Sequence, residues 1–158
     1  LTLLDAEWHT TDRSAWVYAS VANEMSRRGV PAQDLQELFK RMCFNALVGN
    51  DDDHPKNHAI LWLKSGWRLA PMYDVVPCLE GYSPPNLAMA VGREGRVISR
   101  ANLLSHCAHF ALTADQAAAT LAEVIAWESD LRTHYKHTLK GTELMLALAA
   151  IGSARMKA

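Results

Sequence analysis

Apolar residues recur at three- and four-residue steps across positions 35–47, and this pattern restricts the fold more than any other feature of the chain. The repeat consists of Leu35, Leu38, Phe39, Met42, Cys43, Ala46 and Leu47. Such spacing is typical of a helix that buries one face. Pro31 suits the first turn of this helix, and Gly49 with Asn50 suits its end. The sequence therefore predicts a buried helix that stops just before a polar block.

The other predicted elements are mostly helical. Further helices are expected over residues 12–28, 101–110, 113–134 and 143–151. Thr113 and Gln116 have the spacing of a capping box at the start of the third of these. Residues 70–98 contain four prolines and three glycines, so they are expected to be mostly irregular, with a short strand over residues 87–91. The predicted fold class is mainly α.

The composition fits one globular domain and argues against several classes of function. The chain has 158 residues, of which 49% are hydrophobic and 21% charged, and its net charge is -1. It has no general basic field for nucleic acid, and no run approaches the roughly 18 apolar residues of a membrane span. The three cysteines are isolated, which favours buried thiols in a reducing compartment. We therefore expect a cytoplasmic protein without direct nucleic-acid or membrane contacts.

A block of functional side chains follows the buried helix. Residues 49–58 read GNDDDHPKNH and combine acids, histidines, a lysine and amides. A short β-hairpin with a glycine turn is expected over residues 59–69, and Asp74 follows its second strand. The open end of this hairpin would return Asp74 to the neighbourhood of Asn57. We therefore expect Asp52, Asn57 and Asp74 to converge.

These three residue types suit phosphoryl transfer. One carboxylate orients the attacking hydroxyl and accepts its proton, while an amide oxygen and a second carboxylate hold Mg²⁺ on the phosphate oxygens. Protein kinases place the catalytic aspartate and the metal-binding asparagine five positions apart, and a hairpin and a second metal-binding aspartate follow. Asp52 and Asn57 are five positions apart, and Asp74 follows the predicted hairpin. The pattern predicts a kinase-type site.

Two runs resemble the signature of the HipA-like serine/threonine kinase family. Residues 44–58, FNALVGNDDDHPKNH, are similar to an apolar helix end followed by G-N-x-D-x-H-x-K-N. Residues 67–77, WRLAPMYDVVP, are similar to W-x-L-A-P-x-Y-D followed by two hydrophobic residues and proline. The resemblance implies that residues 1–158 form a kinase-like, mainly helical C-terminal lobe with a small β-hairpin that bears the metal site.

The resemblance also implies roles and partners. Asp52 is the implied catalytic aspartate, and Asn57 and Asp74 are the implied Mg²⁺ ligands. His54 and Lys56 are implied to shape the loop or to approach the phosphates of ATP. Members of the family are typically toxins paired with a HipB-like DNA-binding antitoxin, and they phosphorylate translation components. Such an antitoxin and such a protein substrate are therefore the implied partners.

The chain departs from a complete kinase. It has no glycine-rich phosphate loop and no strand lysine, which in the family lie N-terminal to this lobe. We therefore expect the chain to begin partway through a longer protein, and we expect these 158 residues alone to bind ATP weakly.

Several alternatives stay open. One alternative is a non-catalytic or split-kinase module that docks onto an antitoxin or a separate N-lobe. The other is a metal-dependent phosphoesterase. A transition-metal site at His54, Asn57 and His58 is disfavoured because a proline separates the two histidines. Within the acidic triplet, Asp51 and Asp53 are expected to be solvated loop acids.

Overall fold

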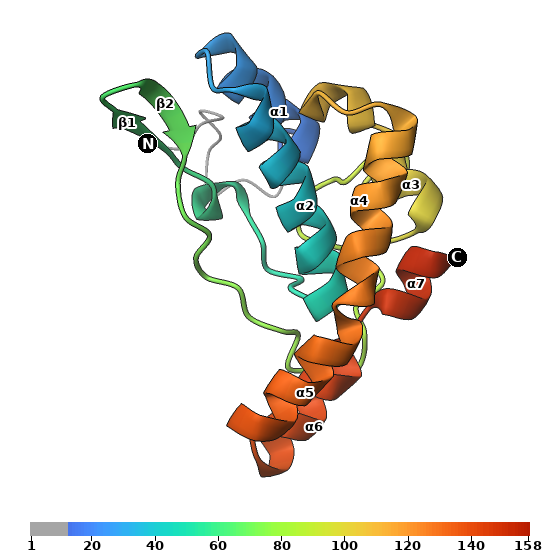
Figure 1. Ribbon diagram of the computed structural model, residues 1–158. Helices are drawn as coiled ribbons and strands as arrows, with labels where there is room; N and C mark the ends of the chain where they lie inside the picture. The colour runs from blue at the N-terminus through green and yellow to red at the C-terminus, as the bar shows by residue number, and fades with distance from the viewer. Residues whose placement is uncertain (1–12) are drawn as a thin grey trace.

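Helix α2 (Ala32–Val48) lies at the centre of the computed structural model, which describes residues 13–158 (Figure 1). Every residue of the predicted apolar face of this helix is buried, with at most 5% of its surface exposed. Helices α1 (Tyr18–Arg27) and α4 (Ala114–Ala126) and the 3-10 helix η2 (Cys107–Phe110) pack against α2. Each large apolar side chain buried here contributes about 1.5–3 kcal/mol. The loop that follows α2 therefore starts from a helix that is packed on several sides in the core.

The sheet is the predicted hairpin. Strands β1 (Ile60–Leu63) and β2 (Gly66–Leu69) pair antiparallel, with Trp62 opposite Trp67. The two indole rings meet edge to face, with their centroids 5.2 Å apart. Within residues 13–158 this is the one sheet, so the mainly α class is confirmed.

The C-terminal half is more segmented than predicted. The helix expected over residues 101–110 is split into α3 (Arg100–Leu104) and η2. Helix α4 begins with the predicted capping box of Thr113 and Gln116, but it ends at Ala126, and α5 (Glu128–Thr138) continues in a different direction (Figure 1). The indole of Trp127 lies edge to face against Phe44 of α2, at 6.1 Å between centroids. The break between α4 and α5 therefore coincides with a contact to a distant helix, and the apolar periodicity of residues 113–134 does not predict it.

The end of the chain supports the end of α2. Helix α6 (Gly141–Ala150) runs beside α5, and a further helix, α7 (Ser153–Lys157), follows the last of the predicted helices. The Gly152 N–H donates to the Leu47 carbonyl at 2.8 Å, and Met156 is fully buried. The C-terminal segment therefore holds the last turn of α2 in place.

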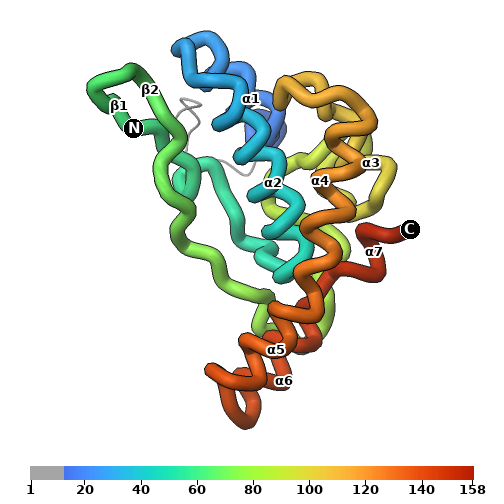
Figure 2. The backbone as a smooth tube through the Cα atoms, viewed as in Figure 1, coloured from blue at the N-terminus to red at the C-terminus, as the bar shows by residue number. Residues whose placement is uncertain are grey.

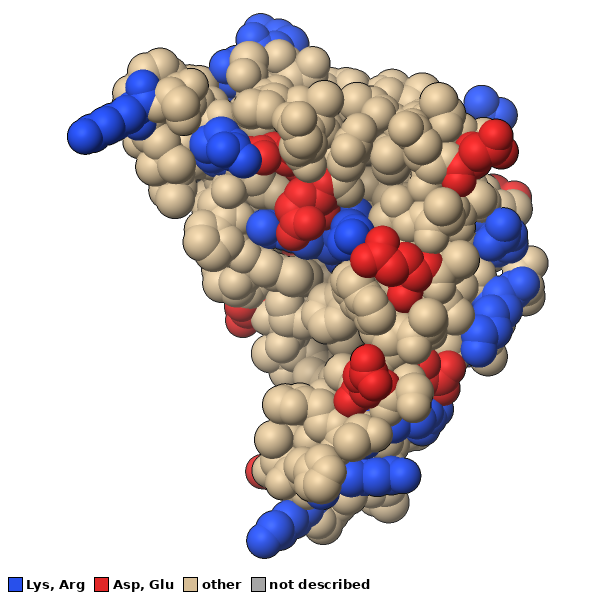
Figure 3. Space-filling model, viewed as in Figure 1, with Lys and Arg blue, Asp and Glu red and all other residues tan. Residues whose placement is uncertain are grey.

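Residues 70–98 are irregular, as predicted, but the strand expected over residues 87–91 is absent. Only isolated bridges occur there, one of which joins Ala90 to Val17. Leu87 and Met89 are nevertheless buried in the core. No helix within residues 13–158 is long and apolar enough to cross a membrane. Basic and acidic side chains are interspersed on the face seen in Figure 3.

Candidate active site

The polar block begins at a tight turn after α2. Gly49 lies in the left-handed region, with φ of 73°, and a β-carbon at this position would lie 2.3 Å from the Ala150 carbonyl oxygen. The next residue, Asn50, donates its backbone N–H to the Asn45 carbonyl at 2.9 Å and its side-chain amide to the Asn45 side-chain oxygen at 3.2 Å. The direction in which the loop leaves the helix is therefore fixed by backbone conformation, packing and two hydrogen bonds.

The three consecutive aspartates have three different environments. Asp51 and Asp52 are exposed, whereas Asp53 is 2% exposed. The prediction that Asp53 is a solvated loop acid is therefore wrong. Asp51 lies beside the buried Cys78 thiol, whose pKa is raised by burial and by the nearby Asp51 carboxylate. Asp52 is therefore the member of the triplet that is neither buried like Asp53 nor placed beside Cys78 like Asp51.

One carboxylate oxygen of Asp53 accepts three hydrogen bonds. The donors are the Tyr18 hydroxyl of α1, the Asn45 side-chain amide of α2 at 2.8 Å and the His58 Nε2 at 2.9 Å. Burial, reinforced by the negative charge of Asp53, raises the pKa of Tyr18, so its hydroxyl keeps the proton that it donates. A carboxylate is expensive to bury without partners, and here the partners come from three separate segments.

A single 3-10 turn, η1 (Pro55–Asn57), follows the aspartates and positions Asn57. The Asn57 N–H donates to the His54 carbonyl at 2.9 Å, and Asn57 is 8% exposed. The His54 ring is half-buried and lies edge to face with Trp16, at 6.4 Å between centroids. Lys56 is exposed. The site thus contains a shielded amide and an exposed cation on one turn, and the phosphate-contacting roles of His54 and Lys56 stay predictions.

Residues 70–78 return from the hairpin and run back along the polar block. Figure 2 shows this segment descending from β2 beside the loop that rises from α2. Three hydrogen bonds join the two segments: the Ala70 N–H to the Ala59 carbonyl at 2.9 Å, the Tyr73 hydroxyl to the Lys56 carbonyl at 2.6 Å, and the Cys78 N–H to the Gly49 carbonyl at 2.8 Å. The bonded pairs fall in antiparallel order, and Asp74 lies on the returning segment between the Tyr73 and Cys78 contacts.

Asp74 itself has an unusual backbone. Its φ is 58°, in the left-handed region, which within residues 13–158 only one other non-glycine residue, Ala111, adopts. Aspartate tolerates this conformation better than most residues, and such conformations persist where the surroundings impose them. Asp74 is exposed. Its carboxylate is therefore accessible on a backbone held between the Tyr73 and Cys78 contacts.

A buried acid that the sequence did not single out fastens the hairpin. Asp34, in the first turn of α2, accepts two hydrogen bonds from the Arg68 guanidinium, both at 2.8 Å, and one from the Leu69 N–H at 2.7 Å. The Arg68 hydrogen bond is the main cause of the lowered pKa of Asp34. Arg41 donates to the Ala70 carbonyl at 2.7 Å. Helix α2 thereby holds the strand that leads to Asp74.

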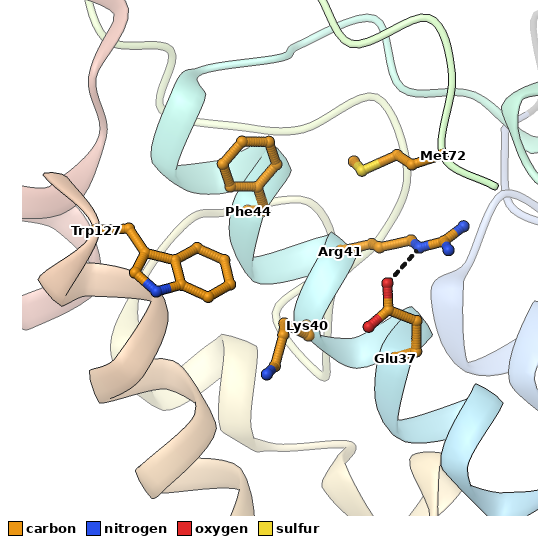
Figure 4. A pocket seen from close by; sticks show the side chains of 6 residues that line it. All are labelled: Glu37, Lys40, Arg41, Phe44, Met72 and Trp127. Carbon is orange, nitrogen blue, oxygen red and sulfur yellow. Dashed lines mark hydrogen bonds and ion pairs between the residues drawn. The ribbon is translucent and has the colours of Figure 1, made fainter. Parts of the chain in front are cut away.

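A small pocket of about 200 Å³ lies between α2, Met72 and Trp127 (Figure 4). It is lined by Glu37, Lys40, Arg41, Phe44, Met72 and Trp127. Its cations are already paired, since Arg41 contacts Glu37 at 2.8 Å and Lys40 contacts Glu123 at 3.0 Å. The pocket does not include the loop acids.

The donor set of the loop suits a hard cation better than a transition metal. Within residues 13–158, no group of three or more histidine, cysteine or acidic side chains is placed to hold a metal ion. Asn57 and Asp74 offer an amide oxygen and a carboxylate oxygen, which are ligand types that Mg²⁺ accepts when substrate phosphates and water complete its shell. By residue type these two ligands are compatible with Mg²⁺ but do not form a self-sufficient metal cage, and a shared Mg²⁺ site at Asn57 and Asp74 stays a prediction.

The fold and the site define a class of protein: a mainly helical domain that presents an acidic loop beside one small hairpin. Residues 2–131 match the family model of the HipA-like C-terminal domain, and the chain belongs to this family. A relative from Sinorhizobium fredii (strain NBRC 101917 / NGR234), named "Putative kinase Y4mE", is 38% identical over 64 residues. The aligned part is 40% of this chain but only 15% of that relative. Family and relative together point to a HipA-like kinase family.

Proposed function

We propose that this chain is the catalytic C-terminal lobe of a protein serine/threonine kinase that transfers the γ-phosphate of ATP to a protein hydroxyl. The observation that carries the proposal is the alignment of residues 70–78 along the polar loop. That alignment brings the segment of Asp74 beside the loop that holds Asp52 and Asn57. The membership in the HipA-like family supports the same reaction class.

Asp52 takes the role of the group that orients the attacking hydroxyl. Its exposure leaves it accessible to a substrate, whereas the carboxylate of Asp53 is shielded and already accepts three hydrogen bonds. The hydroxyl oxygen forms the new bond to the γ-phosphorus, and the bond between that phosphorus and the bridging oxygen breaks. ADP leaves, and the hydroxyl proton passes to Asp52.

Asn57 and Asp74 would hold Mg²⁺ against the nucleotide phosphates. When bound, Mg²⁺ neutralises charge on the transferred phosphoryl group. The contribution of the protein is mainly to position these groups, because the η1 turn fixes Asn57 and the hydrogen-bonded segment fixes Asp74. His54 and Lys56, on the same turn, are the residues that we assign to the phosphates.

The complete protein extends the proposal to partners. Since the aligned part is only a small share of the kinase relative, the nucleotide-binding lobe is proposed to be encoded beside this domain. A HipB-like antitoxin and a translation component as substrate follow from the family resemblance. A cytoplasmic location and a toxin role belong to the same proposal.

The test is phosphoryl transfer by the complete gene product that contains this domain, measured with radiolabelled ATP. Asp52→Ala and Asp74→Ala are each expected to reduce transfer by at least about a hundredfold, because a positioned base and a metal ligand are lost. Asp51→Ala is the matched control, since it removes an exposed neighbouring carboxylate. Full activity in the Asp52→Ala and Asp74→Ala proteins would refute the proposal, as would loss of activity only in the Asp51→Ala protein.

A further inference from the structure

The buried acid beside the proposed catalytic aspartate has no role in the reaction as described. Asp53 lies between the exposed Asp52 and the half-buried His54, yet it is 2% exposed. Asp53 and Asp34 are the two buried acids within residues 13–158, and Asp34 has the hairpin as its partner.

The hydrogen bonds of Asp53 connect the loop to the core. Tyr18 is the first residue of α1, Asn45 belongs to the last turns of α2, and both are fully buried. Asn45 also contacts Asn50 at the start of the loop, at 3.2 Å. The loop is therefore anchored at Asn50 and Asp53 to the buried faces of α1 and α2.

The bond between Asp53 and His58 has a consequence for the two neighbouring residues. It joins their side chains at 2.9 Å, and each of them directly follows a proposed site residue: Asp53 follows Asp52, and His58 follows Asn57. Holding Asp53 and His58 together therefore fixes the separation of the backbone at Asp52 from the backbone at Asn57. The Tyr18 ring, 5.5 Å from the His58 ring between centroids, limits the movement of His58.

We infer that Asp53 is a positioning residue: its buried carboxylate, held by Tyr18, Asn45 and His58, sets the relative placement of Asp52 and Asn57. This inference rests on the proposed kinase function. Asp53 does not contact the substrate, and it acts by keeping the exposed carboxylate and the shielded amide in one arrangement. Misplacement of a reacting group by about 1 Å lowers rates by roughly a hundredfold, so the role is measurable.

The experiment compares variants in the complete gene product. Asp53→Ala removes the acceptor of three hydrogen bonds, and Tyr18→Phe removes one donor while it keeps the ring. We expect Asp53→Ala to lower kcat per folded molecule by about ten- to a hundredfold, with little change in the KM for ATP, and Tyr18→Phe to lower kcat less. Asp51→Asn, an exposed neighbour outside the network, is the matched control and is expected to keep kcat.

Hydrogen exchange of backbone amides provides a readout that does not depend on activity. The N–H groups of Asn57 and His58, which donate to His54 and Pro55, are expected to exchange faster in Asp53→Ala and Tyr18→Phe, while amides in α4 keep their protection. If Asp53→Ala does not fold, Tyr18→Phe decides through the same two readouts. An unchanged kcat in the folded variants, or faster exchange spread equally over α4, would overturn the inference. If the unaltered protein transfers no phosphoryl group, but the loop amides of the variants exchange faster as expected, then the proposed kinase function is wrong and the anchoring role of Asp53 stands.

Discussion

Replacing Gly49 by alanine is expected to destabilise the protein through two separate effects. The first is backbone strain, because Gly49 has φ of 73°, and a left-handed conformation costs an L-residue about 1–2 kcal/mol. The second is a steric clash, because the new β-carbon would lie 2.3 Å from the Ala150 carbonyl oxygen, and this neighbour is backbone that cannot rotate away. Overpacking of this kind costs about 1–3 kcal/mol.

Gly29→Ala is the control that separates the two effects. Gly29 also has positive φ, at 76°, but no atom lies within 4 Å of its added β-carbon. Only the strain is expected there, about 1–2 kcal/mol. The loss in unfolding free energy is therefore expected to be about 2–5 kcal/mol for Gly49→Ala, the sum of strain and overpacking.

Urea denaturation of the purified chain, followed by far-UV circular dichroism, measures both losses. The midpoint shift at unchanged m-value reports the change in free energy of unfolding. If Gly49→Ala lowers this free energy no more than Gly29→Ala does, the contact of α2 with Ala150 does not support the start of the loop, and the reasoning is refuted.

Two further predictions concern residues that hold the scaffold. Asp34→Ala is expected to cost about 1–3 kcal/mol, because the half-buried Leu69 N–H and the Arg68 guanidinium lose their acceptor. Arg68 lowers the folded-state pKa of Asp34, so the stabilisation by this carboxylate is complete above the unfolded-state pKa of about 3.9 and is lost as the pH falls through the lower folded-state pKa. In urea titrations, the difference in unfolding free energy between Asp34→Ala and the unaltered chain should therefore narrow at low pH. A difference that stays constant with pH would contradict this prediction. Thr113→Ala is expected to lower the unfolding free energy by about 1 kcal/mol, since the Thr113 hydroxyl accepts a hydrogen bond from the Gln116 N–H at the start of α4. Thr133→Ala, on the exposed face of α5, is the control. Equal losses of unfolding free energy in the two variants would argue against the capping box.

The elements that could be predicted from sequence are those specified by local signals. The buried face of α2 follows from spacing alone, and the hairpin follows from two apolar runs around Gly66. The capping box likewise depends on two residues three positions apart, Thr113 and Gln116. Each of these depends on residues close together in the chain.

The burial of Asp53 could not be predicted from the loop, because its donors belong to α1 and α2. One signal was available: Asn45 is a polar residue within the apolar stripe of α2, and it is fully buried. A buried amide requires partners, so its presence beside the acidic triplet pointed to one buried aspartate. Nothing in the loop itself distinguishes Asp53 from Asp51.

The break at Trp127 and the irregular course of residues 87–91 depend on tertiary contacts. The apolar run over residues 87–91 reflects burial against the core and not pairing in a sheet. Likewise, α7 is held by the packing of Gly152 on Ala46 and by the burial of Met156. Local propensity does not contain this information.

The central claim is that Asn57 and Asp74 bind one divalent cation beside Asp52. The most direct test adds Mn²⁺, which accepts the same oxygen ligands, to the isotope-labelled complete gene product with ATP and follows paramagnetic broadening by NMR. We expect the Asn57 side-chain amide and the Asp74 backbone amide to broaden together at the lowest Mn²⁺ concentrations. Mg²⁺ should reverse the effect, and Asp74→Ala should abolish it at Asn57. Broadening that begins at other acids, or that persists at Asn57 in Asp74→Ala, would contradict the shared site.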